Sequence, residues 1–397
     1  MSIDEAQVRA AADAVTDPEL RRTLGELGMV RSVSVRRKRV AVDLAVPVAQ
    51  YPQVEDLVAR VRAAVGSLKG VDEVGGEVAV MTEEERRRVR LLLRGEPLDG
   101  GVSAYADENG HTHGGAHDHG QGGQLGHEEG RPNRFMLPRS RTRVIGISSG
   151  KGGVGKSSVT VNLAVALARQ GHDVGILDAD VYGFSVPKML GVRTDPLIID
   201  DLVIPPTVHG VRCLSMGFFV PDETPVIWRG PMLHKALEQF LVDAYWGEPD
   251  FLLVDMPPGT GDVALSLGQY LTKTEVFVVT TPQAAAQRVA QRSAYAARKL
   301  KLAVRGVVEN MSWFTGDDGT RYELFGSGGG KSLAGELGVP LLGQIPLVPA
   351  LREGGDVGVP VMVADPDGEA ARAFSRLAEQ MVGLGPARVY RQELTVH

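Results

Sequence analysis

Apolar and polar residues alternate along the first part of the chain with two different spacings. A spacing of three to four residues predicts amphipathic helices, and strict alternation predicts half-buried strands. These patterns predict helices over residues 6–14 and 54–68, a hairpin over 31–46 and a strand over 71–81. Thr82 and Glu85 then form a capping-box pattern that opens a last helix, whose charged residues 83–88 we expect to face solvent. The order of these helices and strands predicts a small α+β domain over residues 1–95.

Residues 96–138 lack the branched apolar side chains that a core requires. The stretch is Gly-rich and holds five of the nine histidines, which are His111, His113, His117, His119 and His127. Such a composition predicts a disordered, flexible linker, because too little apolar surface is buried to offset the entropy of the chain. The His-x-His pairs either chelate a soft divalent metal through their imidazoles or are simply polar linker residues. The sequence leaves both interpretations open.

Residues 139–385 alternate short apolar strands with helical patterns. The strand candidates are rich in Val, Ile and Leu, and they span residues 144–149, 174–178, 251–255, 275–281, 303–310 and 340–345. This alternation predicts an α/β fold with a doubly wound, mostly parallel sheet that helices cover on both faces. A last helix over 368–384 carries one apolar stripe of core type, and residues 386–397 follow as a tail.

The composition narrows the class of protein and of partner. The chain has 397 residues with a net charge of −6, which argues against a nucleic-acid partner that needs a strongly basic face. No run approaches the roughly 18 apolar residues of a membrane span, and the N-terminus lacks the pattern of a signal peptide. The single cysteine excludes an intrachain disulfide and fits a reducing compartment. We therefore expect a cytoplasmic protein without a membrane or nucleic-acid partner.

Residues 150–157 read Gly-Lys-Gly-Gly-Val-Gly-Lys-Ser and match the phosphate-loop pattern G-x-x-x-x-G-K-[ST]. The glycines allow several backbone N–H groups to converge on a triphosphate. Lys156 is expected to meet the terminal phosphates and Ser157 to bind Mg²⁺. An apolar strand precedes the loop and a helix follows it, so ATP is favoured over a chance glycine-rich turn. The expected nucleotide-binding residues in this segment are Gly150, Lys151, Gly152, Gly153, Val154, Gly155, Lys156, Ser157 and Ser158.

Acidic residues at two strand ends complete the predicted site. Residues 251–255 are four apolar residues and an acid, the Walker B pattern, so Asp255 is expected to hold Mg²⁺ with Ser157. Asp178 and Asp180 follow another strand, where carboxylates suit metal coordination and orientation of the attacking water. We assign the water to Asp180 and a supporting metal role to Asp178, with a pair of helix-capping residues as the alternative. Asn310 ends a further strand and is expected to bind an edge of the adenine.

Lys151 adds a second lysine directly after the first glycine of the loop. The resulting pattern, K-G-G-x-x-K-[ST], resembles the deviant phosphate-loop ATPases, in which this lysine reaches the nucleotide of a partner chain. The resemblance implies a homodimer across the nucleotide site, with Lys151, Lys156 and Asp180 as the catalytic residues. A solvated lysine at a variable loop position is the alternative.

Five motifs together resemble the Mrp/ApbC-type iron–sulfur cluster carrier ATPases. They lie at residues 150–158, 177–183, 228–232, 254–262 and 309–312. The similarity covers residues 140–385, and residues 1–90, with Asp17-Pro18-Glu19-Leu20, resemble the small domain that is often fused in front of these carriers. The resemblance implies an ATP-dependent homodimer that binds an iron–sulfur cluster of [4Fe–4S] type and passes it to apoproteins or assembly factors.

The sequence departs from this family where the cluster chemistry is expected. Carriers place a Cys-x-x-Cys after the Asn-Met-Ser segment, but residues 313–325 contain no cysteine, and Tyr51 stands where the N-terminal domain usually has one. The only thiol, Cys213, lies in an apparent strand over 211–216, where a buried structural role is favoured over ligation. A cluster carrier with altered ligation and a nucleotide-switched interaction protein without a cluster therefore both stay open. A membrane- or DNA-partitioning ATPase is disfavoured, because helix 368–384 has no lysine-rich face.

Overall fold

The structure is a computed structural model, and it describes residues 4–96, 133–180, 183–219, 230–259 and 262–387. Its contacts define two units. The first consists of residues 1–129, 196–205 and 243–247, and the second consists of residues 130–195, 206–242 and 248–397. The predicted linker histidines and nearly all of the predicted tail over 386–397 lie outside the described residues. The same holds for most of the 228–232 motif.

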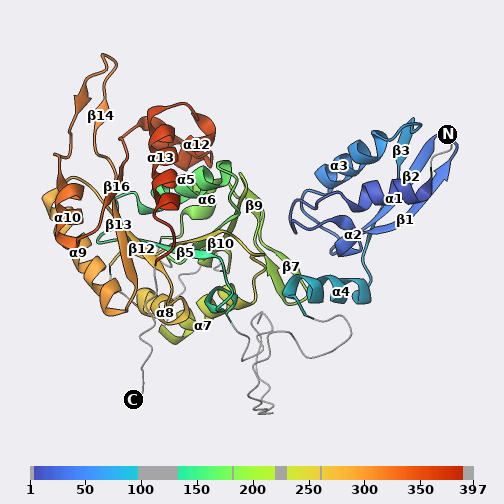
Figure 1. The fold of residues 1–397 in the computed structure, drawn as a ribbon, viewed down its shortest axis with the longest axis horizontal. Coiled ribbons are helices and arrows are strands. Elements are labelled where there is room, and N and C mark those ends of the chain that lie inside the picture. The colour runs from blue at the N-terminus through green and yellow to red at the C-terminus, as the bar shows by residue number, and fades with distance from the viewer. Residues whose placement is uncertain (1–3, 97–132, 181–182, 220–229, 260–261, 388–397) are drawn as a thin grey trace, which may run out of the picture. The chain divides into compact units, whose positions relative to one another are not determined.

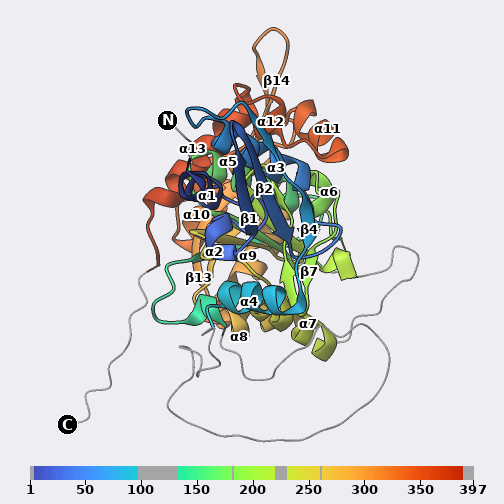
Figure 2. The same cartoon turned by 90° about the vertical axis from the view of Figure 1, so that its right-hand side faces the viewer.

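The first unit contains the small α+β domain that the sequence predicts (Figures 1 and 2). Its elements are α1 (Glu5–Asp13), α2 (Leu24–Leu27), β1 (Val30–Arg36), β2 (Arg39–Val46), α3 (Val54–Gly66), β3 (Glu73–Gly75), β4 (Val78–Val80) and α4 (Glu83–Arg94). Strands β1 and β2 form the predicted antiparallel hairpin, and β3 and β4 both pair in parallel with β2. The hairpin β7 (Leu197–Ile199) and β8 (Leu202–Ile204) also belongs to this unit.

Two expectations for this unit need correction. The single strand predicted over 71–81 is two short strands, because Gly76 takes a φ of 144° between them. A Cβ at Gly76 would lie 1.8 Å from the carbonyl oxygen of Val42, so only glycine fits there. Helix α4 has the predicted capping box between Thr82 and Glu85. Its charged face was expected to be solvated throughout, but Arg86 pairs with Asp200 of the β7–β8 hairpin.

The second unit is the predicted α/β fold with a doubly wound sheet. The strand order is β16-β13-β12-β5-β11-β6-β10-β9, and every pair is parallel except β10 with β9. The strands are β5 (Arg143–Ser149), β6 (Val174–Asp178), β9 (Thr207–Val208), β10 (Val211–Ser215), β11 (Phe251–Asp255), β12 (Glu275–Thr280), β13 (Ala303–Glu309) and β16 (Leu341–Gln344). The six predicted strands of this sheet are confirmed to within about two residues at each end.

Helices cover both faces of this sheet (Figure 1). The helices are α5 (Lys156–Arg169), α6 (Val186–Leu190), α7 (Gly230–Val242), α8 (Asp262–Tyr270), α9 (Ala284–Lys299), α10 (Gly329–Leu337), α11 (Pro349–Val357), α12 (Val361–Ala364) and α13 (Glu369–Gly383). Alternate residues of β12 show the two faces: Phe277 and Val279 pack with α5 and α13, whereas Val276 and Val278 pack with α9 and α10. The sheet is therefore apolar on both sides.

Helix α13 confirms the predicted apolar stripe. Ala371, Phe374, Leu377 and Met381 are all fully buried in the core that α5 and β5 share. Residues 326–332, whose Gly-Gly-Gly-Lys-Ser run is similar to the end of the phosphate loop, form the entry to α10, with Gly328 as its N-cap. None of the helices in the described ranges combines the length and the apolar content that a membrane crossing requires.

The last residues of the predicted linker have a defined structure. A short 3-10 helix, η1, spans Arg134–Met136, and Phe135 is 1% exposed. The Asn133 side chain donates to the carbonyl of Tyr270, 2.9 Å away. A lone aromatic residue in a polar stretch has no periodicity, so the sequence pattern could not reveal this segment.

Candidate nucleotide-binding site

The phosphate loop joins β5 to α5 at the carboxyl edge of the sheet, close to where the strand order reverses. Gly153 and Gly155 take left-handed φ values of 79° and 78°, which glycine adopts without strain. Gly155 is the N-cap of α5 and supplies no side-chain cap, so the first N–H groups of the helix are available to an anion. A Cβ at Gly150 would lie 2.2 Å from the backbone nitrogen of Ala290. The loop is therefore shaped by glycine at both ends.

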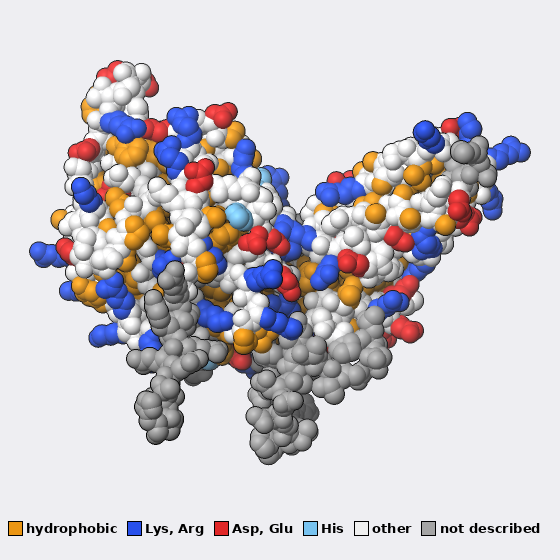
Figure 3. Space-filling model, in the orientation of Figure 1, with side chains coloured by type: hydrophobic (Ala, Val, Ile, Leu, Met, Phe, Trp, Pro, Cys, Tyr) orange, Lys and Arg blue, Asp and Glu red, His pale blue; other side chains and the backbone are white. Residues whose placement is uncertain are grey.

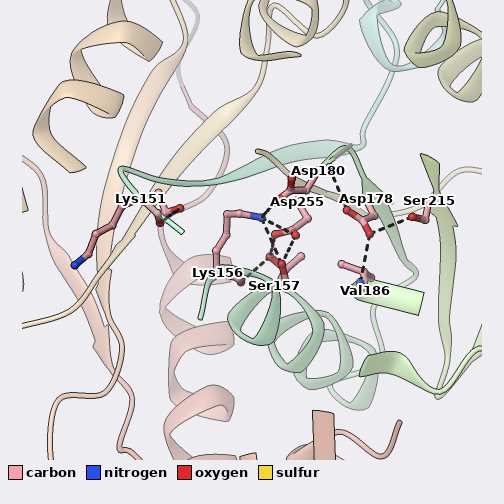
Figure 4. Close-up of polar contacts among 10 residues, drawn as sticks. Lys151, Lys156, Ser157, Asp178, Asp180, Val186, Ser215 and Asp255 are labelled. Carbon is pink, nitrogen blue, oxygen red and sulfur yellow. Dashed lines mark hydrogen bonds and ion pairs between the residues drawn. The ribbon is translucent and has the colours of Figure 1, made fainter. Parts of the chain in front are cut away.

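The Lys156 ammonium lies among three oxygens at the start of α5 (Figure 4). Its Nζ is 2.7 Å from Asp255 Oδ2, 3.4 Å from Ser157 Oγ and 3.5 Å from Asp180 Oδ2. Asp255 is fully buried at the end of β11, and Lys156 is 6% exposed. The structure thus brings together Lys156, Ser157, Asp180 and Asp255, as the motifs predicted. Carboxylate and hydroxyl oxygens around a cation are also the donor set that Mg²⁺ prefers.

Asp255 is held by two hydroxyl groups of α5 in addition to the lysine. Ser157 Oγ donates to Oδ2 at 2.6 Å, and Thr160 Oγ1 donates to Oδ1 at 2.7 Å. Thr160 was not expected at the site from the sequence, although it follows Lys156 by four residues and so lies on the same face of the helix. These bonds fix both carboxylate oxygens at the strand end.

Asp178 lies apart from the lysine and holds the loop that follows β6 (Figure 4). Its Oδ2 accepts hydrogen bonds from Ser215 Oγ at 3.1 Å and from Val186 N at 3.3 Å, and its Oδ1 accepts from Asp180 N at 3.2 Å. Burial, and then the negative charge of Asp255, raise the pKa of Asp178 to about 7. These hydrogen bonds are typical of a positioning residue, and a role of Asp178 as a metal ligand stays a prediction. Ser215 carried no motif and was missed.

Lys151 points away from the Lys156–Asp255 cluster (Figure 4). Its carbonyl accepts a hydrogen bond from Ser149 Oγ at 3.1 Å, which fixes the backbone of the loop and leaves the side chain to extend outward. The ammonium therefore does not face the phosphate site of its own chain. A role toward a second chain stays a prediction.

The Asn310 side chain braces the phosphate loop. Its Nδ2 donates to the carbonyl of Val154 at 2.9 Å, and a Cβ at Gly155 would lie 2.3 Å from that nitrogen. Its Oδ1 is buried without a hydrogen-bond partner among the described residues. An unpaired buried acceptor is costly, so this oxygen suits a ligand donor such as the adenine amino group. Binding of adenine by Asn310 stays a prediction.

Cys213 has the buried structural position that its strand pattern predicts. It lies in the middle of β10, is free and is fully buried. Burial, and then the charge of Asp178, raise the pKa of the thiol well above its usual value, which disfavours the thiolate that metals bind. Within the described ranges, no three His, Cys, Asp or Glu side chains are grouped so that they could hold a metal ion.

The segment where carriers place their cysteines is a hairpin of β14 (Phe314–Thr315) and β15 (Arg321–Tyr322). The Arg321 guanidinium lies 4.4 Å from the centre of the Trp313 ring. Glu369 accepts hydrogen bonds from Trp313 Nε1 at 3.0 Å, Thr315 Oγ1 at 2.8 Å and Arg321 Nη2 at 3.0 Å. Burial alone would raise the pKa of Glu369, but these bonds outweigh it and lower the pKa. The hairpin is fastened by a polar–aromatic cluster in which each charge has a partner.

Tyr51, which the family resemblance matches to a cysteine of the N-terminal domain, is buried. Its hydroxyl donates to Asp17 Oδ1 at 2.8 Å, and the same oxygen accepts from the backbone N–H groups of Glu19 and Leu20. Burial raises the pKa of Asp17 and, with the neighbouring carboxylates, that of Tyr51. The Tyr51 phenol supplies no thiolate, and its hydrogen bond helps to fix the Asp17 carboxyl group.

Comparisons with known proteins match the chain to two protein families. Residues 140–382 match the ParA family described as NUBPL iron-transfer P-loop NTPases, and residues 5–75 match the iron–sulfur cluster assembly protein domain. The chain belongs to this family of iron-transfer P-loop NTPases. The family resemblance seen in the motifs is therefore confirmed. Basic and acidic side chains are interspersed on the visible face of each unit (Figure 3).

Relatives that match most of the chain are named iron–sulfur cluster carrier proteins. The iron–sulfur cluster carrier protein of Mycobacterium bovis is 42% identical over 381 residues, which are 94% of this chain and 92% of the relative. The carrier protein of Synechocystis is 38% identical over 93% of this chain and 94% of its own length. Among solved structures, a nucleotide-binding protein of Archaeoglobus fulgidus in complex with ADP is 34% identical. It has a TM-score of 0.51 and covers 59% of this chain and 93% of its own.

Proposed function

We propose that this protein is a cytoplasmic, homodimeric ATPase that uses ATP binding and slow hydrolysis to deliver iron–sulfur clusters to apoproteins. The observation that carries the nucleotide part is the Lys156 ammonium among the oxygens of Asp255, Asp180 and Ser157, beside an uncapped helix N-terminus. The cluster part rests on the family and on the names of the relatives. The two parts are supported by different observations and need separate tests.

Lys156 has two alternative sets of partners in this proposal. Without phosphate, its charge is compensated by Asp255 and Asp180. A triphosphate at the start of α5 brings a greater negative charge, so the ammonium turns from the carboxylates to the phosphate oxygens. The oxygens that it leaves, Ser157 Oγ and Asp255 Oδ2, fit Mg²⁺, which when bound would neutralise phosphate charge. In this proposal Lys156 therefore changes partners each time nucleotide binds.

Hydrolysis then depends on Asp180 and Lys151. Asp180 lies 3.5 Å from the Lys156 ammonium, at the start of the loop that Asp178 holds, so it suits orientation of the attacking water. Lys151 points away from its own site, which supports a role on the nucleotide of a second chain. A cation that arrives from the partner would stabilise the charge on the transferring phosphoryl group, as arginine fingers do.

The cluster is the cargo, and this chain offers few ligands for it. A dimer has two thiols, and Cys213 is fully buried within a strand of the sheet. A [4Fe–4S] cluster usually takes four cysteines. We therefore propose that the client or an assembly factor supplies ligands during transfer. The burial of Cys213 also favours a second candidate, a nucleotide-switched interaction protein that binds no cluster.

Anaerobic reconstitution with iron and sulfide separates the two candidates. For the carrier, we expect a weak or substoichiometric cluster absorption on the isolated protein, and a strong one when an apoprotein client is present. For the interaction protein, absorption stays at background with or without the client. About one stable [4Fe–4S] cluster per dimer in the isolated protein, unchanged by Cys213→Ser and by deletion of residues 97–132, would contradict our assignment of the ligands.

The nucleotide part is tested by titration of the full chain with a non-hydrolysable ATP analogue. We expect saturable binding with Mg²⁺ that weakens when EDTA removes the ion. Absence of binding under both conditions would exclude the proposed ATPase, whatever the outcome of the reconstitution.

A further inference from the structure

The β7–β8 hairpin lies in sequence between elements of the second unit but packs as part of the first. Residues 196–205 and 243–247 both belong to the first unit, although the chain enters and leaves them from the second. Val203 N donates to the carbonyl of Asp243 at 3.2 Å, and Tyr245 N donates to that of Val203 at 2.8 Å. The two segments therefore form one short sheet-like extension.

This extension shares a core with helix α4 and its neighbours. Ile199, Leu202, Ile204 and Tyr245 are at most 3% exposed, and they belong to the same apolar cluster as Val89 and Leu93 of α4. Burial of four such apolar side chains stabilises the packing of the hairpin in this unit. The hairpin is thus an integral part of the packing of the first unit.

Ion pairs fasten the tip of the hairpin to α4. Asp201 Oδ2 lies 2.7 Å from Arg94 Nη2, and its Oδ1 lies 3.1 Å from Arg90 Nη1. Asp200 lies 3.4 Å from Arg86 Nε. The three arginines are four residues apart, so they form one stripe on the helix. The Arg94 side chain is only 8% exposed, so its pair with Asp201 is shielded from solvent. We refer to Arg90, Arg94 and Asp201 as the arginine clasp.

Prolines stand at both connections of the hairpin. The chain enters at Pro196 and leaves through Pro205-Pro206. The proline ring fixes φ near −65°, so these connections have fewer soft torsions than ordinary loops. Beyond them, Cys213 N donates to the carbonyl of Pro206 at 2.9 Å, which ties the exit directly to β10. The exit of the hairpin is therefore held to β10 by a backbone hydrogen bond.

These connections start at the residues that hold Asp178. Before the hairpin lies α6, whose first residue, Val186, donates its N–H to Asp178 Oδ2. After the hairpin lies β10, whose last residue, Ser215, donates its hydroxyl to the same oxygen. Residues 243–247 continue into β11, which ends at Asp255. Three connections of the extension thus lead toward the nucleotide site: the entry from α6, the exit through β9 to β10, and the exit into β11.

We propose that the hairpin is a built-in coupling element, through which nucleotide at the Asp178–Asp255 site changes how firmly the arginine clasp holds α4 and its small domain. This inference rests on the proposed ATP binding. Coupling between two equilibria is reciprocal: if nucleotide changes the clasp, loss of the clasp changes the affinity for nucleotide by the same factor. Nucleotide affinity therefore reports on a contact that touches no nucleotide.

The test measures the affinity of the full-length protein for a fluorescent non-hydrolysable ATP analogue with Mg²⁺. We expect the double variant R90E/R94E to change the dissociation constant at least about threefold, within the usual range of allosteric coupling. The triple variant R90E/R94E/D201R inverts all three charges of the clasp and should restore the wild-type value. The matched control is R87E/R88E, which places the same charges on exposed positions of the same helix and should leave the affinity unchanged.

A second measurement tests the coupling without the double variant, which could fail to fold. Hydrogen exchange followed by mass spectrometry should show that the analogue changes the protection of residues 83–94 and 197–204 in the wild type, and that the conservative variant D201N reduces this change. Equal affinities in all variants, with unchanged exchange in the wild type, would overturn the coupling and leave the proposed ATPase intact. Equal shifts in R90E/R94E and R87E/R88E would also overturn it, because the effect would then be one of net charge. If the analogue does not bind the wild type, both the proposed ATPase and the coupling are contradicted.

Discussion

The loops that follow β5 and β13 both leave the carboxyl edge of one parallel sheet. They differ in whether a ligand can replace the partners of their charged groups. After β5, the Lys156 ammonium has carboxylate partners that a phosphate can replace, and the N–H groups at the start of α5 have no side-chain cap. After β13, the Glu369 carboxylate is fully engaged by Trp313, Thr315 and Arg321. The first loop is arranged to exchange partners and the second is fastened. The carboxylate partners of Lys156 can thus be replaced by a phosphate, whereas residues 313–325 are held in one arrangement by Glu369.

The largest effect is expected from Lys156→Ala. Loss of the ammonium leaves the phosphates without their buried cation, so turnover should fall on the order of 100-fold or more. Steady-state release of phosphate measures this. Lys331→Ala is the matched control, because Lys331 lies in the similar Gly-Gly-Gly-Lys-Ser run but is exposed on α10. Turnover that survives in Lys156→Ala, or falls equally in both variants, would contradict the assignment of the loop.

Lys151→Ala should separate binding from hydrolysis. Since the side chain points away from its own site, the dissociation constant for ATP should stay within about twofold, whereas hydrolysis falls at least about 10-fold. Sedimentation with and without a non-hydrolysable analogue should also show weaker dimerisation than in the wild type. Dimerisation that the substitution leaves unaffected would refute a role between chains.

Cys213→Ser probes the cysteine as a structural residue. A hydroxyl in the apolar interior beside β6 and α5 should lower the free energy of unfolding by about 1–2 kcal/mol, measured by denaturant titration. The cluster absorption per folded protein should not change. Cys213→Ala is the control that keeps the site apolar, and it should cost less. A cluster signal that disappears in both variants would identify Cys213 as a ligand after all.

The smallest effect on stability is expected from Glu369→Gln, which tests whether Glu369 holds the β14–β15 hairpin in place. Weakened charge-assisted bonds should reduce local stability of the 313–325 hairpin by about 1 kcal/mol, seen as faster hydrogen exchange. Because the folded pKa of Glu369 lies below its usual value of 4.5, the stabilisation is present above that pH. It is lost as the pH falls through the folded pKa. Glu379→Gln, on the same helix, is the control, and hairpin exchange that responds equally to both would show that Glu369 does not fasten it.

The nucleotide site was largely predictable because its parts are local patterns joined by a simple topological rule. The phosphate loop and the Walker B strand are contiguous segments, and carboxyl ends of neighbouring parallel strands meet at one edge. Lys156 and Asp255 were therefore expected to approach each other although they are 99 positions apart in the chain, and they lie 2.7 Å from each other. Thr160 and Ser215 were not predicted, because a single hydroxyl in an apolar element carries no pattern of its own.

The sequence by itself determined the family, six of the strands of the parallel sheet with its last helix, and the absence of the expected cysteines. Each of these depends on residue identity or on periodicity over a short window. Only the tertiary structure decided that residues 196–205 pack in the core of the N-terminal unit and that Arg90 and Arg94 meet Asp201. Short strands of three residues have almost no local signal, and they are stabilised by side chains more than 100 positions away along the chain. Contacts at that separation arise from packing of the whole chain, which no local spacing encodes.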